Sequence, residues 1–340
     1  LSVNVLGSQS VAIGHNALLF QNPASAVDMN NVAIGYGTGA QITTATQNTL
    51  IGGLSGDALV DGAANTALGF ETLTADTKGQ NNVAIGHHAL STQNFTSLTS
   101  SYNTAVGSQA GLSVTTGEKN VLIGGLAGDA LTDSDTNVAV GYIALSSDTL
   151  GNGSTAVGNG ALRDQNFTSA TTTYNTAVGF QAGLSVTTGE RNTFVGGLAG
   201  DAITTGERNV AMGHGALSDD TTGSRSTAIG YQSFTTTNTT DGSNVYNTGL
   251  GYQSGSAVTT GGFNTLLGGF AGDAIVSGHS NIMIGYGTDA AHDGFNNITI
   301  GVNITGNDND FAFGKASNVV KNDFDTDANW SRSSDERLKK

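Results

Sequence analysis

Residues able to carry out acid–base, nucleophilic or metal chemistry are few in this sequence and do not gather into a recognised pattern. No HExxH pair or other metal-ligand spacing occurs among the six histidines, which are His15, His87, His88, His214, His279 and His292. Cysteine is absent, which excludes disulfides and thiolate metal sites. We therefore expect the body of the chain to be no enzyme and to need no metal and no cofactor.

One carboxylate motif recurs at a fixed spacing. Asp129, Asp201 and Asp273 lie in the segments GGLAGDAL, GGLAGDAI and GGFAGDAI. Calcium-binding nonapeptide repeats also combine glycines with an aspartate. Here, however, the third glycine directly precedes the aspartate, and the motif occurs once in four repeats rather than on successive ones. The sequence favours a turn with an outward carboxylate over a calcium site.

The composition points to an all-β chain with a thin core. Glycine occupies 50 of 340 positions, proline one, and hydrophobic residues make up 37%. Glycine is a poor helix former, and the periodic segments are rich in Val, Ile and Thr. The net charge of −15 predicts repulsion from nucleic acids and anionic membranes. No apolar run approaches the roughly 18 residues of a membrane span. The chain begins with Leu and shows no signal peptide, so we expect its true start to have been removed.

The dominant feature is an internal repeat. The motif NVAIG at Asn31 recurs in related forms, and we count 18 copies from Ser10 to Asp310. From Ser10 the spacing runs 21, 17, 17 and 17 residues and then repeats almost without error, which gives a superperiod of 72 residues. Such periodicity predicts one structural unit per copy.

The length of the repeat selects the architecture. Seventeen residues are too few for a βαβ unit, which needs about 30, but are enough for one turn of a narrow β-solenoid. Within NVAIG, Val32 and Ile34 share one face of the strand, and Asn31 and Ala33 share the other. The second half of each unit predicts turns and a second short strand. We therefore expect an all-β, parallel β-solenoid of about 18 coils.

The recurrence of asparagine at the start of most copies indicates one of two roles for its side chain. Its amide could bond to the equivalent amide one coil later and so form a ladder, or it could only cap a turn. The residues in question are Asn31, Asn48, Asn65, Asn82, Asn103, Asn120, Asn137, Asn175, Asn192, Asn209, Asn247, Asn264, Asn281 and Asn297.

The repeat motif resembles the head domain of Yersinia-type trimeric autotransporter adhesins over residues 10–314. The resemblance implies a left-handed parallel β-roll and an elongated homotrimer in which three chains associate along their lengths. The family repeat is usually shorter, so longer outer turns are implied here. Burying one face against its copies would stabilise a thin roll with a small core.

The C-terminal segment has a different character, because ten of its final twenty residues are charged. SDERLK at residues 334–339 resembles the S-D-x-R-x-K signature that opens the self-cleaving intramolecular chaperone of phage tailspikes, tail fibres and endosialidase-type tail proteins. The resemblance implies a scissile bond between Ser333 and Ser334, with Ser334 as nucleophile and Lys339 as base. Burial in an assembled trimer favours the neutral lysine that such a base requires. A polar disordered tail is the alternative. The chain stops after Lys340, so we expect this fragment to be inert as an enzyme.

The 21-residue repeats offer the best candidate binding surface. Their four extra residues should bulge outward at regular intervals. Aromatic side chains beside Asn and Thr suit contact with a receptor glycan or protein. The candidates are Phe95, Tyr102, Phe167, Tyr174 and Tyr246. A tolerated surface insertion, or aromatic residues that seal a trimer, are the alternatives.

Together these patterns predict the shaft of a trimeric extracellular or virion-surface fibre, most simply a phage tail fibre involved in host attachment. A bacterial surface adhesin and a free filament of end-to-end trimers are alternatives. We divide the chain into an N-terminal connection (1–9), the repeat shaft (10–314), a connector or neck (315–333) and the start of the cleavage motif (334–340).

Overall fold

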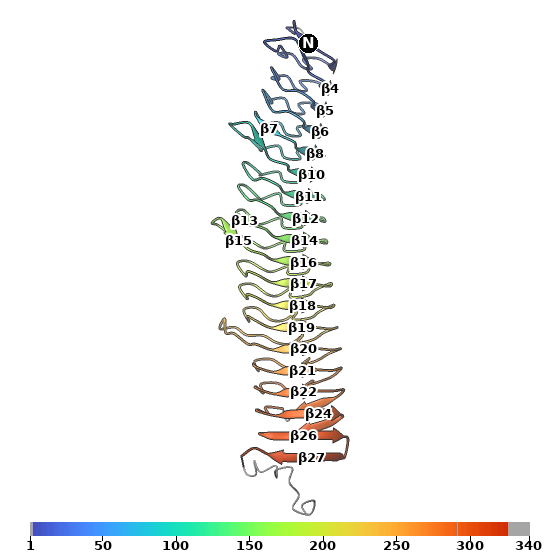
Figure 1. Cartoon of the computed structure of the whole chain (residues 1–340), viewed down its shortest axis with the longest axis vertical. Coiled ribbons are helices and arrows are strands. Elements are labelled where there is room, and N and C mark those ends of the chain that lie inside the picture. Colours follow the sequence, from blue (N-terminus) through green and yellow to red (C-terminus); the bar gives the residue numbers. More distant parts are fainter. Residues whose placement is uncertain (1–2, 291, 326–340) are drawn as a thin grey trace, which may run out of the picture. The chain divides into compact units, whose positions relative to one another are not determined.

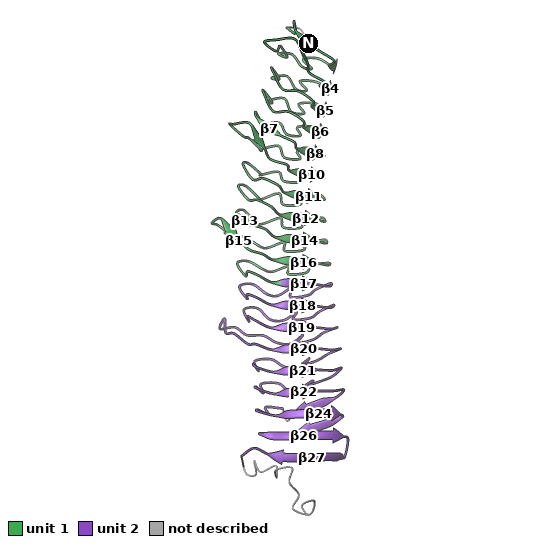
Figure 2. Ribbon diagram, viewed as in Figure 1, with its two compact units in different colours: residues 1–192 green, residues 193–340 purple. Residues whose placement is uncertain are grey.

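The computed structural model describes residues 3–290 and 292–325, and every regular element in these ranges is a β-strand (Figure 1). The chain divides into two compact units, Leu1–Asn192 and Thr193–Lys340 (Figure 2). Each unit is a parallel β-solenoid. The first contains ten motif strands and the second eight, which confirms the predicted fold class of about 18 turns.

In the first unit, each motif strand is the central three residues of the five-residue motif and pairs in parallel with the next copy. Val32, Ala33 and Ile34, for example, lie opposite Thr49, Leu50 and Ile51. The motif strands are β2 (Val11–Ile13), β4 (Val32–Ile34), β5 (Thr49–Ile51), β6 (Thr66–Leu68), β8 (Val83–Ile85), β10 (Thr104–Val106), β11 (Val121–Ile123), β12 (Val138–Val140), β14 (Thr155–Val157) and β16 (Thr176–Val178).

The second unit has the same pattern, and its described residues end in a hairpin. Its motif strands are β17 (Thr193–Val195), β18 (Val210–Met212), β19 (Thr227–Ile229), β20 (Thr248–Leu250), β21 (Thr265–Leu267), β22 (Ile282–Ile284), β24 (Ile298–Val302) and β26 (Asp310–Lys315). The final strand, β27 (Asn318–Asp323), pairs antiparallel with β26 and lies within the predicted connector. Lys321 on β27 donates from Nζ to the carbonyl oxygen of Thr305 at 3.0 Å and lies 3.6 Å from Asp310 Oδ2.

The predicted second short strand is confined to a few places. In the first unit, short parallel pairs occur only beside the 21-residue turns, and the 17-residue turns have bends and turns there instead. The pairs beside β8 and β14 project beyond the neighbouring turns (Figure 1). These short strands are β1 (Gly7–Ser8) with β3 (Val27–Asp28), β7 (Gly79–Gln80) with β9 (Thr99–Ser100), β13 (Gly151–Asn152) with β15 (Thr171–Thr172), and, in the second unit, β23 (Thr288–Ala290) with β25 (Ile304–Gly306).

The small residues of the motif point into the core and the branched residues point out. Asn31 and Ala33 are fully buried, whereas Val32 and Ile34 remain partly exposed. The same alternation of burial marks nearly every motif strand of both units. The interior of the turns is lined by Asn and Ala together with Leu, Ile, Val and a few Phe and Met side chains.

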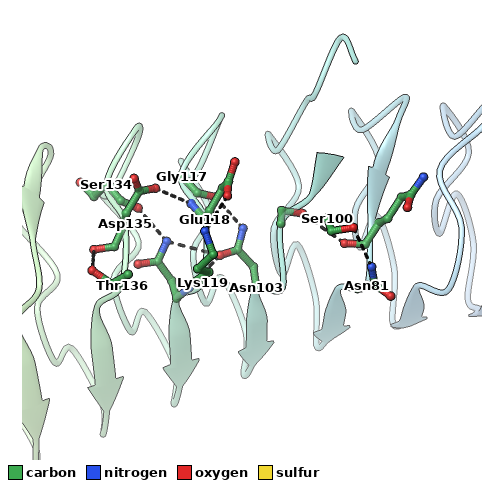
Figure 3. Close-up of polar contacts among 12 residues, drawn as sticks. Asn81, Ser100, Asn103, Gly117, Glu118, Lys119, Ser134, Asp135 and Thr136 are labelled. Atoms are coloured by element: carbon green, nitrogen blue, oxygen red, sulfur yellow. Dashed lines mark hydrogen bonds and ion pairs between the residues drawn. The ribbon is translucent and has the colours of Figure 1, made fainter. Parts of the chain in front are cut away.

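The asparagines form runs of contacts between successive turns, and Ser154 and Ser226 stand in place of an asparagine between these runs. The backbone N–H of Asn48 donates to Asn31 Oδ1 at 2.9 Å, and the backbone N–H of Asn65 donates to Asn48 Oδ1 at 2.9 Å. The side-chain amide of Asn48 also donates to the carbonyl of Gly62, fourteen residues on. Figure 3 shows the equivalent contact of Asn103 with Gly117. Both predicted roles occur together in Asn48, Asn65, Asn120 and Asn137, each of which joins adjacent turns and also donates to a turn carbonyl.

The glycine that closes each motif strand sits against the next turn. Gly124 has φ +134°, and a Cβ there would lie 2.4 Å from the carbonyl oxygen of Gly141. No side chain fits this spacing, and the backbone conformation is strained for any residue but glycine.

We expect Gly124→Ala to lower the free energy of unfolding by about 3 kcal/mol, because it combines backbone strain with a backbone overlap. Gly125→Ala is the matched control, since a Cβ at Gly125 would meet Tyr142 Cδ2 at an ordinary 3.5 Å. This control should change the free energy by no more than about 1 kcal/mol. Denaturant unfolding of both variants checks the pair, and equal effects would contradict the close approach of these turns.

Candidate functional site

The clearest surface feature of each unit is a column of outward apolar residues. We number each turn from its motif residue, so that Asn120 is position 1 and Ile123 is position 4. We call the residues at position 4 the apolar stripe. In the first unit they are Ile13, Ile34, Ile51, Leu68, Ile85, Val106, Ile123, Val140, Val157 and Val178. In the second unit they are Val195, Met212, Ile229, Leu250, Leu267, Ile284, Ile300 and Phe313.

The stripe is open to solvent in the single chain and carries no charge. Ile13 is 57% exposed, Leu68 44% and Leu250 52%. The chain has 12 Lys and Arg and 27 Asp and Glu, yet none stands at position 2 or position 4 of any turn. Contiguous apolar surface that excludes charge is typical of a surface covered by a partner.

Aromatic side chains flank the stripe at position 6. In the first unit, Tyr36 is 60% exposed and stacks on His15 with ring centroids 5.6 Å apart. In the second unit, Tyr231 stacks between His214 and Tyr252 at 5.7 and 5.3 Å. His15 and His214 each follow the motif glycine of their turn, so position 6 of these turns carries stacked rings beside the apolar stripe.

The predicted contact residues of the 21-residue turns do not share one environment. Phe95 and Phe167 are only 6% and 5% exposed, because each side chain packs inward at the base of its projecting loop. Their prediction as contact residues for a receptor is therefore corrected: these two rings belong to the core.

The three tyrosines at the loop ends are exposed. Tyr102 is 57% and Tyr174 63% exposed, so both rings are open to contact. In the second unit, Tyr246 is 46% exposed, but its ring stacks on Phe263 at 5.6 Å and lies 5.5 Å from the Arg225 guanidinium. A ligand stacking on a tyrosine face thus has better access to the two rings of the first unit.

The carboxylates of the described residues do not assemble a metal centre. Within residues 3–290 and 292–325, no group of three or more His, Asp or Glu side chains could hold a metal ion. Asp129 and Asp201, from the recurring GD motif, are half-buried, and burial raises the pKa of both.

One carboxyl group in the second unit has a strongly altered pKa. Asp289 accepts hydrogen bonds from the backbone N–H groups of Ala290 at 2.9 Å and Ala274 at 3.1 Å. Burial raises the pKa of Asp289 to about 6, and the nearby charge of Asp273 adds to the rise. An ordinary aspartate titrates near 3.9, so the folded chain retains this proton at pH values where the unfolded chain has lost it.

The proton on Asp289 therefore adds to the free energy of unfolding. This contribution is complete below about pH 4 and is lost as the pH rises through about 6. We expect Asp289→Asn to flatten the fall in the free energy of unfolding between pH 4 and 7. The control Asp133→Asn, at an exposed position, should leave that fall unchanged. Urea unfolding at a series of pH values measures the free energy of unfolding of both variants. If that free energy falls as steeply in Asp289→Asn as in the unaltered chain, the raised pKa of Asp289 is refuted.

The residues predicted for self-cleavage, Ser333, Ser334 and Lys339, lie outside the described residues. None of the described residues belongs to a helix long and apolar enough to cross a bilayer. No protein-family model, no curated protein and no solved structure matches the chain. The candidate site therefore rests on the geometry of the chain itself, and its main element is the apolar stripe.

Proposed function

We propose that the chain is the structural shaft of a homotrimeric extracellular fibre, in which the apolar stripe of each copy packs against the stripes of two others. The observation that carries the proposal is the stripe itself. It offers an aliphatic or aromatic side chain on every turn and no charge. A solenoid this narrow cannot bury that face against its own core, because its interior is already filled.

A second copy of the chain is the occupant that fits the stripe best. Symmetric assemblies bring identical patches together, and an uncharged patch meets its own copy without repulsion. The net charge of −15 resides elsewhere on the chain and keeps the remaining surface solvated. The number three comes from the resemblance of the repeat to trimeric adhesin heads.

A phage tail fibre is the assembly that we favour. The S-D-x-R-x-K match at residues 334–339 supports this choice, since it resembles the start of the chaperone that such fibres carry. Under this proposal the chain matures by cleavage before Ser334 and acts at the virion surface during host attachment. Tyr102 and Tyr174 are then the side chains best placed for a host glycan or protein, because their rings are exposed.

The free filament of end-to-end trimers has weaker support. The last strand among the described residues of the second unit, β27, carries Lys321 and Asp323. Charged residues on an edge strand discourage strand-to-strand addition. A bacterial surface adhesin fits the apolar stripe equally well and differs only in what anchors the fibre.

Electron microscopy with gold-labelled antibodies against the chain tests the proposal. Label on fibres that project from phage tails supports a tail fibre. Label on bacterial envelopes would favour the adhesin, and label along long free fibrils would favour the filament. Label only on globular particles would refute a shaft.

A further inference from the structure

Polar residues interrupt the aliphatic core of the solenoid at fixed intervals. In the turns that open at Ser10 to Asn264, position 12 points inward, and its residues are fully buried. The aliphatic ones are Ile42, Leu59, Val114, Leu131 and Val186 in the first unit and Ile203, Val258 and Ile275 in the second. The polar ones are Gln21, Asp76, Gln93, Asp148 and Gln165 in the first unit and Asp220 and Thr237 in the second.

Asp76 and Gln93 form a buried pair across adjacent turns. Asp76 Oδ1 accepts from the backbone N–H of Gly79 at 2.9 Å and of Phe95 at 3.2 Å, and Oδ2 accepts from Gln93 Nε2 at 2.6 Å. Gln93 Oε1 then accepts from the side-chain amide of Asn103 at 2.8 Å. The pair thus links three consecutive turns, the middle one being a 21-residue turn.

Asp148 and Gln165 repeat the arrangement 72 residues later. Asp148 Oδ1 accepts from the N–H groups of Gly151 at 3.1 Å and Phe167 at 3.0 Å, and Oδ2 accepts from Gln165 Nε2 at 2.5 Å. Gln165 Oε1 accepts from the Asn175 amide at 2.9 Å. Each aspartate therefore holds the first residue of a projecting loop, since Phe95 and Phe167 stand where the extra residues begin.

We propose that these Asp–Gln pairs fix the register of the solenoid, which is the choice of which turn stacks on which. Each projecting loop then forms on its own 21-residue turn. Neighbouring turns have nearly the same motif, and pairing displaced by one turn would lose few apolar contacts. Such a displacement would, however, bring Asp76 against an aliphatic residue and leave its buried carboxylate without Gln93. Enforcing register is the best-attested use of a buried polar group.

The second unit contains a weakened version of the pair. Thr237 replaces the glutamine, and Asp220 Oδ2 is buried without a hydrogen-bond partner among the described residues. Asp220 Oδ1 still accepts from the backbone N–H of Thr239 at 3.1 Å and from its hydroxyl at 2.8 Å. The loop that follows should be held less firmly than its two counterparts in the first unit.

Hydrogen exchange followed by mass spectrometry tests the inference on the full chain. The quadruple variant Asp76→Leu, Gln93→Val, Asp148→Leu, Gln165→Val should give two populations with different exchange in peptides covering 91–102 and 163–174. The control Leu59→Ile, Leu131→Ile alters two aliphatic residues at position 12 and removes no polar group. It should give one population. A single population in the quadruple variant, as protected as the unaltered chain, would overturn the proposal.

A restoring variant keeps the inference testable if the quadruple variant does not fold. Thr237→Gln supplies the partner that Asp220 Oδ2 lacks, and we expect exchange in residues 235–246 to slow about tenfold. In the unaltered chain, the same peptide should exchange faster than 91–102 and 163–174. Equal exchange in all three loops, or no slowing in Thr237→Gln, would contradict the role proposed for the Asp–Gln pairs.

Discussion

Three lysines placed in the apolar stripe of the first unit are expected to separate the proposed trimer into single chains. The variant is Ile51→Lys, Ile123→Lys, Val157→Lys, with at least one turn between successive changes. A single chain tolerates these lysines because the positions are partly exposed and long side chains can extend into water. In the assembly each ammonium would be buried without a partner, at several kcal/mol each. We expect association to weaken at least about a thousandfold, as measured by size exclusion with light scattering.

The matched control adds the same charge away from the stripe. Thr44→Lys, Thr116→Lys, Thr188→Lys alters three exposed positions of the same unit and should leave the assembly intact. Circular dichroism of both variants establishes that the β-solenoid persists. If the stripe variant stays trimeric, or if both variants dissociate alike, the stripe is not the interface.

Removal of one ladder asparagine should produce the second large effect. Asn120 Oδ1 accepts from the backbone N–H of Asn137 at 2.9 Å, and Asn120 Nδ2 donates to the carbonyl of Ser134 at 2.7 Å. Asn120→Leu keeps the size of the side chain but leaves both backbone groups without this partner. Each unsatisfied buried group costs about 1–3 kcal/mol, so we expect a loss of roughly 2–6 kcal/mol in the free energy of unfolding.

The control for this variant is Asn159→Ala. Asn159 lies at position 6 of its turn and is exposed, so its loss should change stability by no more than about 0.5 kcal/mol. Guanidinium unfolding followed by circular dichroism compares the two. Equal stability of both variants would show that the ladder only fills space.

The repeat determines the fold, but it does not say which face of the strand is inside. A period of two places Asn31 and Ala33 on one face and Val32 and Ile34 on the other, and hydrophobicity alone favours the second pair for the core. The structure reverses this choice, because the amide of Asn31 bonds to the next turn in the interior, and the residue two places on is buried with it, whether it is Ala33, Leu50 or Phe194. Position 4 is apolar in all 18 copies. This constancy was the sequence signal for an outward face that packs against a partner.

The projecting loops show a second limit of sequence patterns. Phe95 and Phe167 follow exposed asparagines in polar segments, and their burial depends on how the longer turn folds back on itself. Asp76 and Gln93 also look like ordinary turn residues until position 12 is aligned across turns. Position within the turn, rather than local composition, decides whether each of these side chains is inside.

Sedimentation equilibrium of the unaltered chain measures whether its copies associate into a trimer. We expect a mass three times that of the 34.2 kDa chain. A mass of 34.2 kDa at every concentration tested would contradict it.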